Sequence, residues 1–508
     1  MIETFATSQI GVPVLSLMIL LPVIVSVALY FVSPIAQLRR IAIGAILVEL
    51  VLGLIALLAF DSNGADVQLA ESVGWMPVLG SSLHLGVDGI SVLFLPLSAL
   101  VILLAMLSGG VVPKGSPRGY WVNLLLLQAS VVGVYTAQDL VLFFLFWEAM
   151  LIPSYFLILL WGNGSSSKQV ASNYVLYMLI GSVPLLIGIA ALGASTGTFD
   201  LVALSGMDIP GELQTLVFVL FFIAFAVKAP LPPFHTWLPA VAMGGPAGIA
   251  IFLVGLKLGT YGMIKILLPL VPDAVVAWQP FLIWYGILAM LYGGFVALAQ
   301  NNLRRMLAYA SVSHVGMVVA GIFALNATAL QGSVMAMVNM TIASTVMMLL
   351  AGTIFRRLGT TDLNGLGGVA RHAPVMAVAF FVAALASIGM PGTSGFQGEF
   401  AILAGVFEAG RLAGAVALLG VILGAGYVLW FYERAFFGPV ASKNVSAMQD
   451  LGKNERGGVM AAIALILLLG LAPSIAIRTT SGAAETLVQT LSQQNATQVA
   501  TVATSVIK

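Results

Sequence analysis

The stretch LVLFFLFWEAMLIPSYFLILLW, residues 140–161, carries one charge, Glu148, among apolar and aromatic side chains. A helix needs ~20 such residues to cross the ~30 Å hydrocarbon core of a bilayer, so the stretch predicts a transmembrane span. The whole composition agrees, because 60% of the 508 residues are hydrophobic and only 8% are charged. A soluble domain has about 25% charged residues, so a soluble fold is excluded.

Apolar runs of similar length recur along the chain and predict an all-α polytopic membrane protein with about fourteen spans. The predicted spans lie near residues 12–34, 41–60, 87–108, 120–136, 139–161, 170–194, 214–229, 246–270, 278–299, 306–325, 329–355, 374–409, 411–437 and 457–477. The polar tail at 478–508 is rich in Thr, Ser and Gln and predicts at most a weak helix.

Two of these spans are expected to be broken. The sequence PLPPFHTWLP at 230–239 directly follows Ala229, the last residue of the seventh span. The sequence GMPGTSGF lies at 389–396, in the middle of the twelfth span. Proline cannot continue a helix. Broken backbone at membrane depth is tolerated only inside protein or beside water, so both breaks indicate a buried hydrophilic path.

The positions of the breaks suggest an internal repeat. Helices 4–8 (120–270) and 9–13 (271–437) would each place a broken helix fourth, after three N-terminal helices in 1–119 and before a final helix and tail in 438–508. A unit with an odd number of spans reverses its orientation, so the second unit is expected to be an inverted copy of the first.

Basic residues are distributed unequally between the two sides of the predicted topology, which sets orientation. Three, Arg411, Arg478 and Lys508, fall on one side, and three lysines lie within spans. The other side carries Arg39, Arg40, Lys114, Arg118, Lys168, Arg304, Arg305, Arg356, Arg357, Arg371, Arg434, Lys443, Lys453 and Arg456. Asp66 and six other acids lie opposite them. Both termini are therefore expected outside the cytoplasm.

Composition also limits the chemistry. The chain has no cysteine, which excludes cysteine-ligated clusters, and its four histidines show no metal-ligand spacing. The net charge of +1 gives no electrostatic support for nucleic-acid binding. No nucleotide-binding motif is present, so no cofactor and no redox centre are expected in this chain.

Among the ionisable residues inside predicted spans, five are the candidates for a proton path: Glu148, Lys228, Lys257, His314 and Glu399. A charge in mid-membrane costs at least ~2.5–3.5 kcal/mol, so such residues are functional candidates by default. We expect Glu148 and Lys228 to form a pair, with Lys257 midway along the eighth helix. The alternatives are an architectural pair and, for His314, a hydrogen-bonded core histidine.

Other charges are weaker candidates. His235 is expected to hydrogen-bond within the first break, and Asp139 to cap the fifth span. Glu49 and Lys265 are expected to snorkel or to pair near interfaces.

Five strings together resemble the antiporter-like membrane subunits of respiratory complex I over roughly residues 80–440. They are FWEAMLIPSYFLI (146–158), FAVKAPLPPFHTWLP (225–239), LKLGTYGMIK (256–265), RRMLAYASVSHVGM (304–317) and GMPGTSGFQGEF (389–400). Glutamate at 399 resembles the M-type branch, since the L- and N-type sisters and Mrp antiporters typically carry lysine there. The resemblance implies fourteen core helices with inverted repeats, a Glu148–Lys228 pair, a connecting Lys257, an axial His314 and a terminal Glu399.

Two departures from the family pattern stand out. Relatives usually read HTWLPDAHxxAP after the first break, whereas this chain reads HTWLPAVAMGGP at 235–246 and lacks the Asp and second His. The eleventh span usually carries a His–Gly pair, and here Asn339 stands at that position. The first loss affects the route by which protons are expected to enter from the cytoplasm. The second affects one position along the expected central proton path.

The resemblance implies a proton-translocating subunit of NADH:quinone oxidoreductase in the inner (cytoplasmic) membrane. Its partners would be the L-, N-, K-, A-, J- and H-type membrane subunits, with lipid and protons. The alternatives are an Mrp-like cation/proton antiporter, a membrane subunit of a hydrogenase or ferredoxin-fed complex, and a purely structural scaffold.

Overall fold

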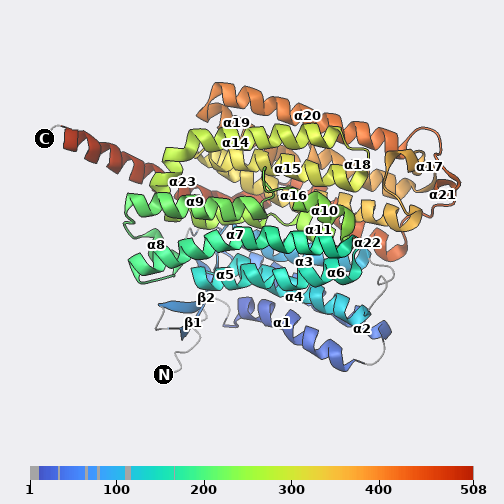
Figure 1. The fold of residues 1–508 in the computed structure, drawn as a ribbon, viewed down its shortest axis with the longest axis horizontal. Helices are drawn as coiled ribbons and strands as arrows, with labels where there is room; N and C mark the ends of the chain where they lie inside the picture. Colours follow the sequence, from blue (N-terminus) through green and yellow to red (C-terminus); the bar gives the residue numbers. More distant parts are fainter. Residues whose placement is uncertain are drawn as a thin grey trace.

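The computed structural model describes residues 11–32, 35–62, 64, 67–76, 80–108, 116–164 and 166–506, excluding the side chains of 36 and 492–506. Within these residues, eleven helices are long and apolar enough to cross a membrane. They run side by side in one bundle (Figure 1). Two shorter apolar helices, Ser91–Leu107 and Pro374–Ser387, accompany them.

The helices and strands follow one another in three groups. The N-terminal group comprises α1 (Val14–Ala28), η1 (Leu29–Phe31), α2 (Ile35–Ala59), β1 (Gln68–Met76), β2 (Ser81–Val87) and α3 (Ser91–Ser108). The middle group comprises α4 (Pro117–Thr136), α5 (Leu140–Ala149), α6 (Leu151–Trp161), α7 (Ser167–Thr196), α8 (Leu201–Ser205), α9 (Gly211–Lys228), α10 (Trp237–Gly244), α11 (Ala247–Gly255), α12 (Leu258–Gly262), the π-helical turn η3 (Met263–Leu267) and α13 (Leu268–Leu270). The last group comprises α14 (Pro272–Leu298), α15 (Leu303–Ile322), α16 (Ala327–Leu358), η4 (Leu363–Gly365), α17 (Val369–His372), α18 (Pro374–Ser387), α19 (Gly395–Ala409), α20 (Arg411–Phe436), α21 (Lys443–Ser446), α22 (Lys453–Leu471) and α23 (Ser474–Val506).

Both predicted helix breaks are confirmed. Helix α9 ends at Lys228 and α10 begins at Trp237, while α18 ends at Ser387 and α19 begins at Gly395. Prolines and glycines in these segments account for both breaks.

A third break was not predicted. The eighth span divides between α11 and α12, and Lys257 lies in the gap with a non-helical backbone, φ −110° and ψ 53°. The prediction that Lys257 sits in mid-helix is therefore wrong. Its ammonium donates to the carbonyl of Val254, one of the acceptors that the end of α11 leaves free. The continuous apolar run of 247–270 hides this break in the sequence.

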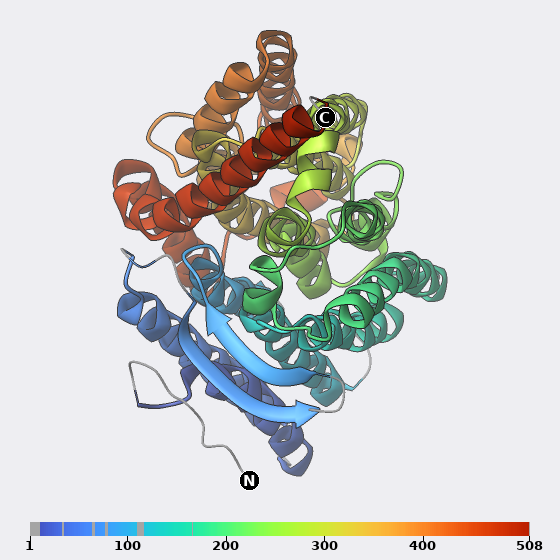
Figure 2. The same ribbon diagram turned by 90° about the vertical axis from the view of Figure 1, so that its left-hand side faces the viewer.

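An antiparallel β-hairpin follows α2, where the sequence indicated only a loop. Figure 2 shows the hairpin and α23 at the same end of the bundle. Glu71 of β1 accepts hydrogen bonds from the backbone N–H groups of Leu15, at 2.8 Å, and Ser16, at 2.9 Å. The hairpin therefore caps the N-terminus of α1, whose first N–H groups have no partner within the helix.

The hairpin is also attached to the loops around it. The Asp139 carboxylate caps α5, as predicted, by accepting from Val141 and Leu142, and it also accepts from the Ser81 hydroxyl at 3.0 Å. The His84 ring lies 2.6 Å from the Asp200 carboxylate.

The C-terminal segment is more ordered than the sequence indicated. The tail expected to be weakly helical forms the long helix α23, and Gln331 of α16 donates to the Ile477 carbonyl at 3.2 Å. Packing against the bundle stabilises a helix that the polar sequence does not favour alone.

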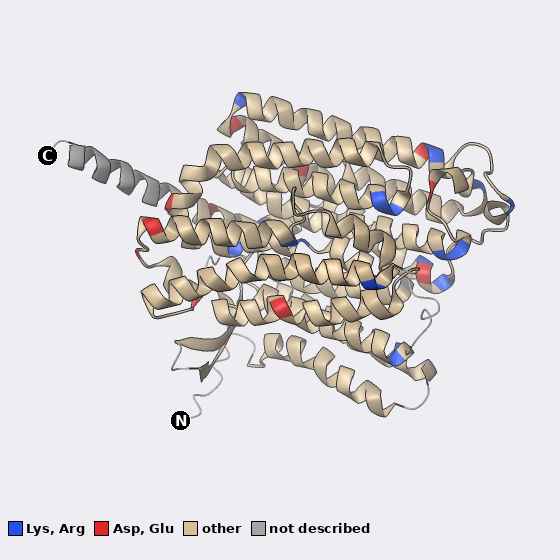
Figure 3. Ribbon diagram, viewed as in Figure 1, with Lys and Arg blue, Asp and Glu red and all other residues tan. Residues whose placement is uncertain are grey.

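Basic residues gather mainly at the end of the bundle away from the hairpin (Figure 3). There Arg356 and Arg357 of α16 bind Glu455 of α22, at 2.8 and 2.6 Å. Lys114, Asp66 and Lys508, which contributed to the predicted orientation, lie outside the described residues.

Glu71→Gln is expected to loosen the start of α1. The amide accepts weaker bonds than a carboxylate, so about 1–2 kcal/mol of local stability should be lost. Hydrogen exchange at Leu15 and Ser16 should speed up about tenfold. Glu212→Gln, a change at an exposed glutamate of α9, is the matched control. Equal exchange in both variants would show that Glu71 does not hold α1.

The hairpin contact is expected to weaken in acid. Burial alone would raise the pKa of Asp200, but hydrogen bonds from His84 and Ala203 and the His84 charge hold this pKa below the usual value of an aspartate. A lowered carboxyl pKa contributes stability above the unfolded value, ~3.9, and that stability is lost as pH falls further. Exchange protection of residues 81–87, corrected for intrinsic rates, should fall below about pH 4. Asp200→Asn should abolish this pH dependence, whereas Asp208→Asn, at an exposed site, should retain it.

Candidate proton path

Glu148 and Lys228 lie on neighbouring helices but do not form the direct pair that the sequence predicted. Within the described residues, no ion pair within 4.0 Å joins them. Glu148 accepts a hydrogen bond from the Ser182 hydroxyl of α7, and the Lys228 ammonium lies 4.7 Å from the centroid of the Trp147 ring. Trp147 and Glu148 are adjacent on α5, and successive helix residues point in different directions. When Trp147 faces Lys228, Glu148 therefore faces α7. Both charges are only partly buried.

Lys257 lies at the centre of the bundle with 5% of its surface exposed. Besides the Val254 carbonyl, its ammonium donates to the Ser311 hydroxyl of α15 at 2.8 Å. Neither partner is a carboxylate. The break between α11 and α12 thus turns the lysine toward α15, and its partners are neutral oxygens.

His314 follows Ser311 by three residues on α15, so the two side chains share one face of the helix. The His314 ring is 7% exposed, and its Nε2 lies 3.4 Å from the Tyr427 hydroxyl of α20. Ser311 and Tyr427 were not predicted, because serine and tyrosine carry no distinctive signal in an apolar span. Ser311 therefore links Lys257 to the helix face that carries His314.

Glu399 completes this line from the other side. It lies on α19, just beyond the second break, and is 8% exposed. A cavity of about 10 Å³ is lined by both His314 and Glu399, with Ser313, Ser387 and Gly420. That volume is about what one water molecule requires. The structure therefore brings Lys257, His314 and Glu399 into one polar line, whereas Glu148 and Lys228 form a separate group.

Asn339 of α16 holds the second break together. Its amide donates to the Ala386 carbonyl at the end of α18, at 2.9 Å, and its oxygen accepts from the Ser394 hydroxyl before α19, at 2.7 Å. It is 3% exposed. The residue that departs from the family pattern thus connects both halves of the broken helix.

The first break is closed by aromatic donors. The Trp237 indole donates to the Val227 carbonyl at 3.0 Å, and the Tyr285 hydroxyl donates to the Pro232 carbonyl at 2.5 Å. His235 Nε2 lies 3.0 Å from the Tyr292 hydroxyl of α14, so the described contact of this ring is with a neighbouring helix and not, as predicted, within the break itself. Its Nδ1 has no partner among the described residues.

Two further charged residues are Glu49, whose burial differs from the prediction, and Lys265, whose partner lies far away in the sequence. Glu49 of α2 is fully buried, not interfacial, and within the described part of the chain neither carboxylate oxygen makes a hydrogen bond of normal geometry, although Gln128 of α4 lies beside it. Lys265 pairs with Asp88 at 2.7 Å. These two residues are far apart in the chain, so no local pattern could reveal the contact.

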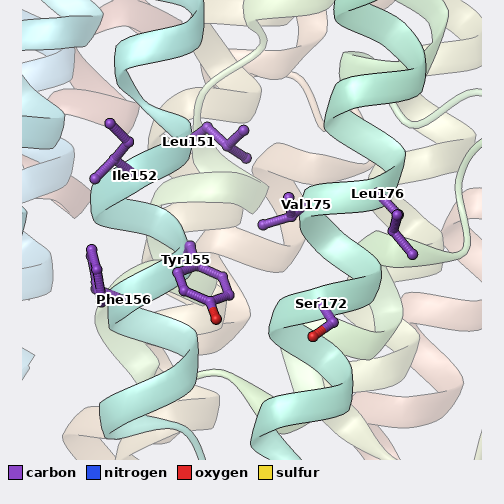
Figure 4. A pocket seen from close by; sticks show the side chains of 7 residues that line it. All are labelled: Leu151, Ile152, Tyr155, Phe156, Ser172, Val175 and Leu176. Atoms are coloured by element: carbon purple, nitrogen blue, oxygen red, sulfur yellow. The ribbon is translucent and has the colours of Figure 1, made fainter.

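A larger surface pocket of about 490 Å³ lies between α6 and α7 (Figure 4). Its lining is Leu151, Ile152, Tyr155, Phe156, Ser172, Val175 and Leu176. With no ionisable side chain other than a tyrosine, it offers no proton station, and an apolar groove on a membrane helix suits lipid chains.

Comparison with known proteins agrees with this geometry. The family model described as "NADH:quinone oxidoreductase/Mrp antiporter, TM" matches residues 137–424. The chain belongs to this family of multi-pass membrane proteins. One curated relative, "NADH-quinone oxidoreductase subunit M" of Rickettsia conorii, is 35% identical over 94% of this chain and 99% of its own. The resemblance inferred from the sequence is thereby confirmed.

Solved structures show the same architecture. A chain of respiratory complex I from Thermus thermophilus with bound NADH matches with a TM-score of 0.87 and 30% identity, over 94% of this chain and 99% of that one. A chain of the Mrp complex from Dietzia sp. DQ12-45-1b shares the fold, with a TM-score of 0.84 and 23% identity over 94% of this chain and 99% of that one.

Asn339→Ala is expected to destabilise the second break. It removes the donor to Ala386 and the acceptor for Ser394, and an unsatisfied buried group costs about 1–3 kcal/mol. Hydrogen exchange in residues 386–396 should increase. Thr341→Val is the control, because the described side-chain hydrogen bond of Thr341, on the same helix, goes back to the Met337 carbonyl. If the two variants behaved alike, Asn339 would not clamp the break.

Proposed function

We propose that this chain is the M-type proton-translocating subunit in the membrane arm of an NADH:quinone oxidoreductase. The observation that carries the proposal is the polar line from Lys257 through Ser311 and His314 to Glu399. Ionisable groups in mid-membrane are retained at a cost, and several of them along one line fit proton transfer better than packing. The identity to subunit M of Rickettsia conorii supports the assignment.

The proposed topology has fourteen spans. Helices α3, α4 and the broken pair α18–α19 would add three to the eleven long spans. We assign 1–119 to the three N-terminal helices, 120–270 and 271–437 to inverted five-helix repeats, and 438–508 to the final helix and tail. The breaks at α9–α10 and α18–α19, each in the fourth span of its unit, support the repeat.

In this proposal each residue has a role in moving a proton. Glu148 and Lys228 serve the first repeat, where Glu148 accepts from Ser182 and Lys228 lies over the Trp147 ring. Lys257 connects to the second repeat through Ser311, and a water between His314 and Glu399 would bridge the last interval. Glu399 is the terminal station.

The energy for pumping would come from other subunits. Redox chemistry is assigned to partners, since the chain has no cysteine to ligate an iron–sulfur cluster. We propose L-, N-, K-, A-, J- and H-type membrane subunits as partners, the inner membrane as location, and both termini outside the cytoplasm, in keeping with the basic end opposite the hairpin (Figure 3).

Lys257→Met and Glu399→Gln are expected to reduce NADH-driven proton pumping about tenfold or more, the effect of ~1.4 kcal/mol on a transfer barrier. Each substitution keeps a side chain of similar shape but removes the group that carries a proton. Pumping is measured by acidification in membrane vesicles, with assembly checked by purification on a C-terminal tag. Glu408→Gln, at an exposed site on the same helix as Glu399, should pump normally.

The same purification separates this function from its rivals. Recovery of subunits bearing flavin and iron–sulfur clusters, with inhibitor-sensitive NADH:quinone activity, supports the proposal. Recovery only with other antiporter-like chains, and cation/proton exchange in their vesicles, would replace it with an Mrp-like antiporter. If both Lys257→Met and Glu399→Gln pumped fully in the assembled complex, the chain would be a structural scaffold and not a proton-translocating subunit.

A further inference from the structure

A second polar cavity lies away from the line just described, at the hairpin end of the bundle. Its volume is about 350 Å³, and Asp88 and Lys265 both line it. Gln138, Ser205 and Thr490 add polar groups from three other parts of the chain. A polar cavity of this size can hold several waters, unlike the apolar groove between α6 and α7.

The Asp88–Lys265 ion pair forms part of its wall. One Asp88 oxygen accepts from the backbone of Ile90 and Ser91, at 3.0 and 2.8 Å, and the other accepts from the Lys265 ammonium at 2.7 Å. The two side chains are 13% and 11% exposed. Asp88 is therefore held by the start of α3 as well as by Lys265.

Lys265 lies on the π-helical turn η3, between α12 and α13. Single π-helical turns inside helices occur frequently at functional sites. A change from π to α geometry shifts the register of the turn by one residue, which would turn Lys265 away from Asp88. The backbone thus supplies an element that could open the ion pair without unfolding the span.

An aromatic group includes Tyr261, which lies in the chain between the central lysine and this ion pair. Tyr261 stands four residues after Lys257 and four before Lys265. Its hydroxyl donates to the Tyr135 carbonyl at 3.0 Å, and the two rings lie 4.8 Å apart. Phe94 stacks on Tyr135 at 5.2 Å. The Tyr135 hydroxyl is buried and has no partner in the described part of the chain, so a polar atom is available within the aromatic group.

We propose that this cavity is a water-filled vestibule that exposes the Asp88–Lys265 pair to the aqueous phase at the hairpin end. The pair is its latch, and the Phe94, Tyr135 and Tyr261 rings close it toward Lys257. The vestibule gives water and protons a route to the first repeat that does not pass Glu399. This role rests on the proposed proton translocation, but the hydration of the cavity does not.

The absence of cysteine in the chain permits a direct test. Ile264 and Ile266 are both fully buried on η3, but only Ile264 lines the cavity. Ile264→Cys and Ile266→Cys are compared in the assembled complex without turnover. The membranes are oriented so that the hairpin end of the bundle faces the solution that contains the probe. The probe is a small, charged, membrane-impermeant methanethiosulfonate, and labelling of this chain is followed by mass spectrometry.

Ile264→Cys should react about tenfold faster or more than Ile266→Cys, because the reaction needs a thiolate in contact with water. Val183→Cys, on the exposed face of α7 in mid-span, should stay unlabelled and reports on lipid exposure. Equal, slow reaction of both isoleucine variants would overturn the vestibule.

The latch is tested on the same background. Adding Asp88→Asn to Ile264→Cys removes the charge that holds Lys265 and should speed up labelling severalfold, whereas adding Asp208→Asn should not. An unchanged rate would refute the latch. Labelling requires no turnover, so this result stands apart from pumping. A dry cavity would overturn this inference alone, and normal pumping by Lys257→Met and Glu399→Gln would overturn the proposed function alone.

Discussion

Backbone hydrogen bonding inside the membrane is the constraint on which this structure depends. A helix interrupted in hydrocarbon exposes N–H and C=O groups that water cannot reach, and each unsatisfied group costs several kcal/mol. Three of the interruptions in the described spans are closed by side chains: Trp237 binds the end of α9, Asn339 binds the end of α18, and Lys257 binds the end of α11. The groups that repair the backbone lie in or beside the candidate proton path.

Charges are used differently at the ends and in the middle of the bundle. Near the ends they form ion pairs, such as Arg357 with Glu455 and Lys265 with Asp88. In the middle, the described contacts of Lys257 are neutral oxygens, and those of Glu148 include a serine hydroxyl. A tight ion pair fixes protonation states, whereas a neutral partner leaves a group able to gain or lose its proton as its surroundings change. The unpaired centre therefore suits transfer, and the paired ends suit stability.

The departures from the family pattern acquire a physical meaning in this setting. Asn339 offers both a donor and an acceptor, so one side chain binds the two halves of the broken helix, which no apolar residue could do. After the first break, the Asp and second His of the family pattern are absent, and His235 instead contacts Tyr292. The second break is thus held by a neutral amide, and the first by aromatic hydroxyl and indole groups.

The sequence alone determined the features that local chemistry controls. Apolar run lengths predict the spans, proline and glycine predict two of the breaks, and isolated charges predict most of the candidate site. Tertiary structure decided the rest. At its helix break Lys257 contacts Ser311 of α15, which lies 54 residues further along the chain, and the burial of Glu49 depends on packing against neighbouring helices. The orientation of Glu148 toward α7 and the Asp88–Lys265 pair likewise join residues far apart in the chain. Such contacts leave no periodic trace in either partner, because each is set by where separate helices meet rather than by the residues next to it.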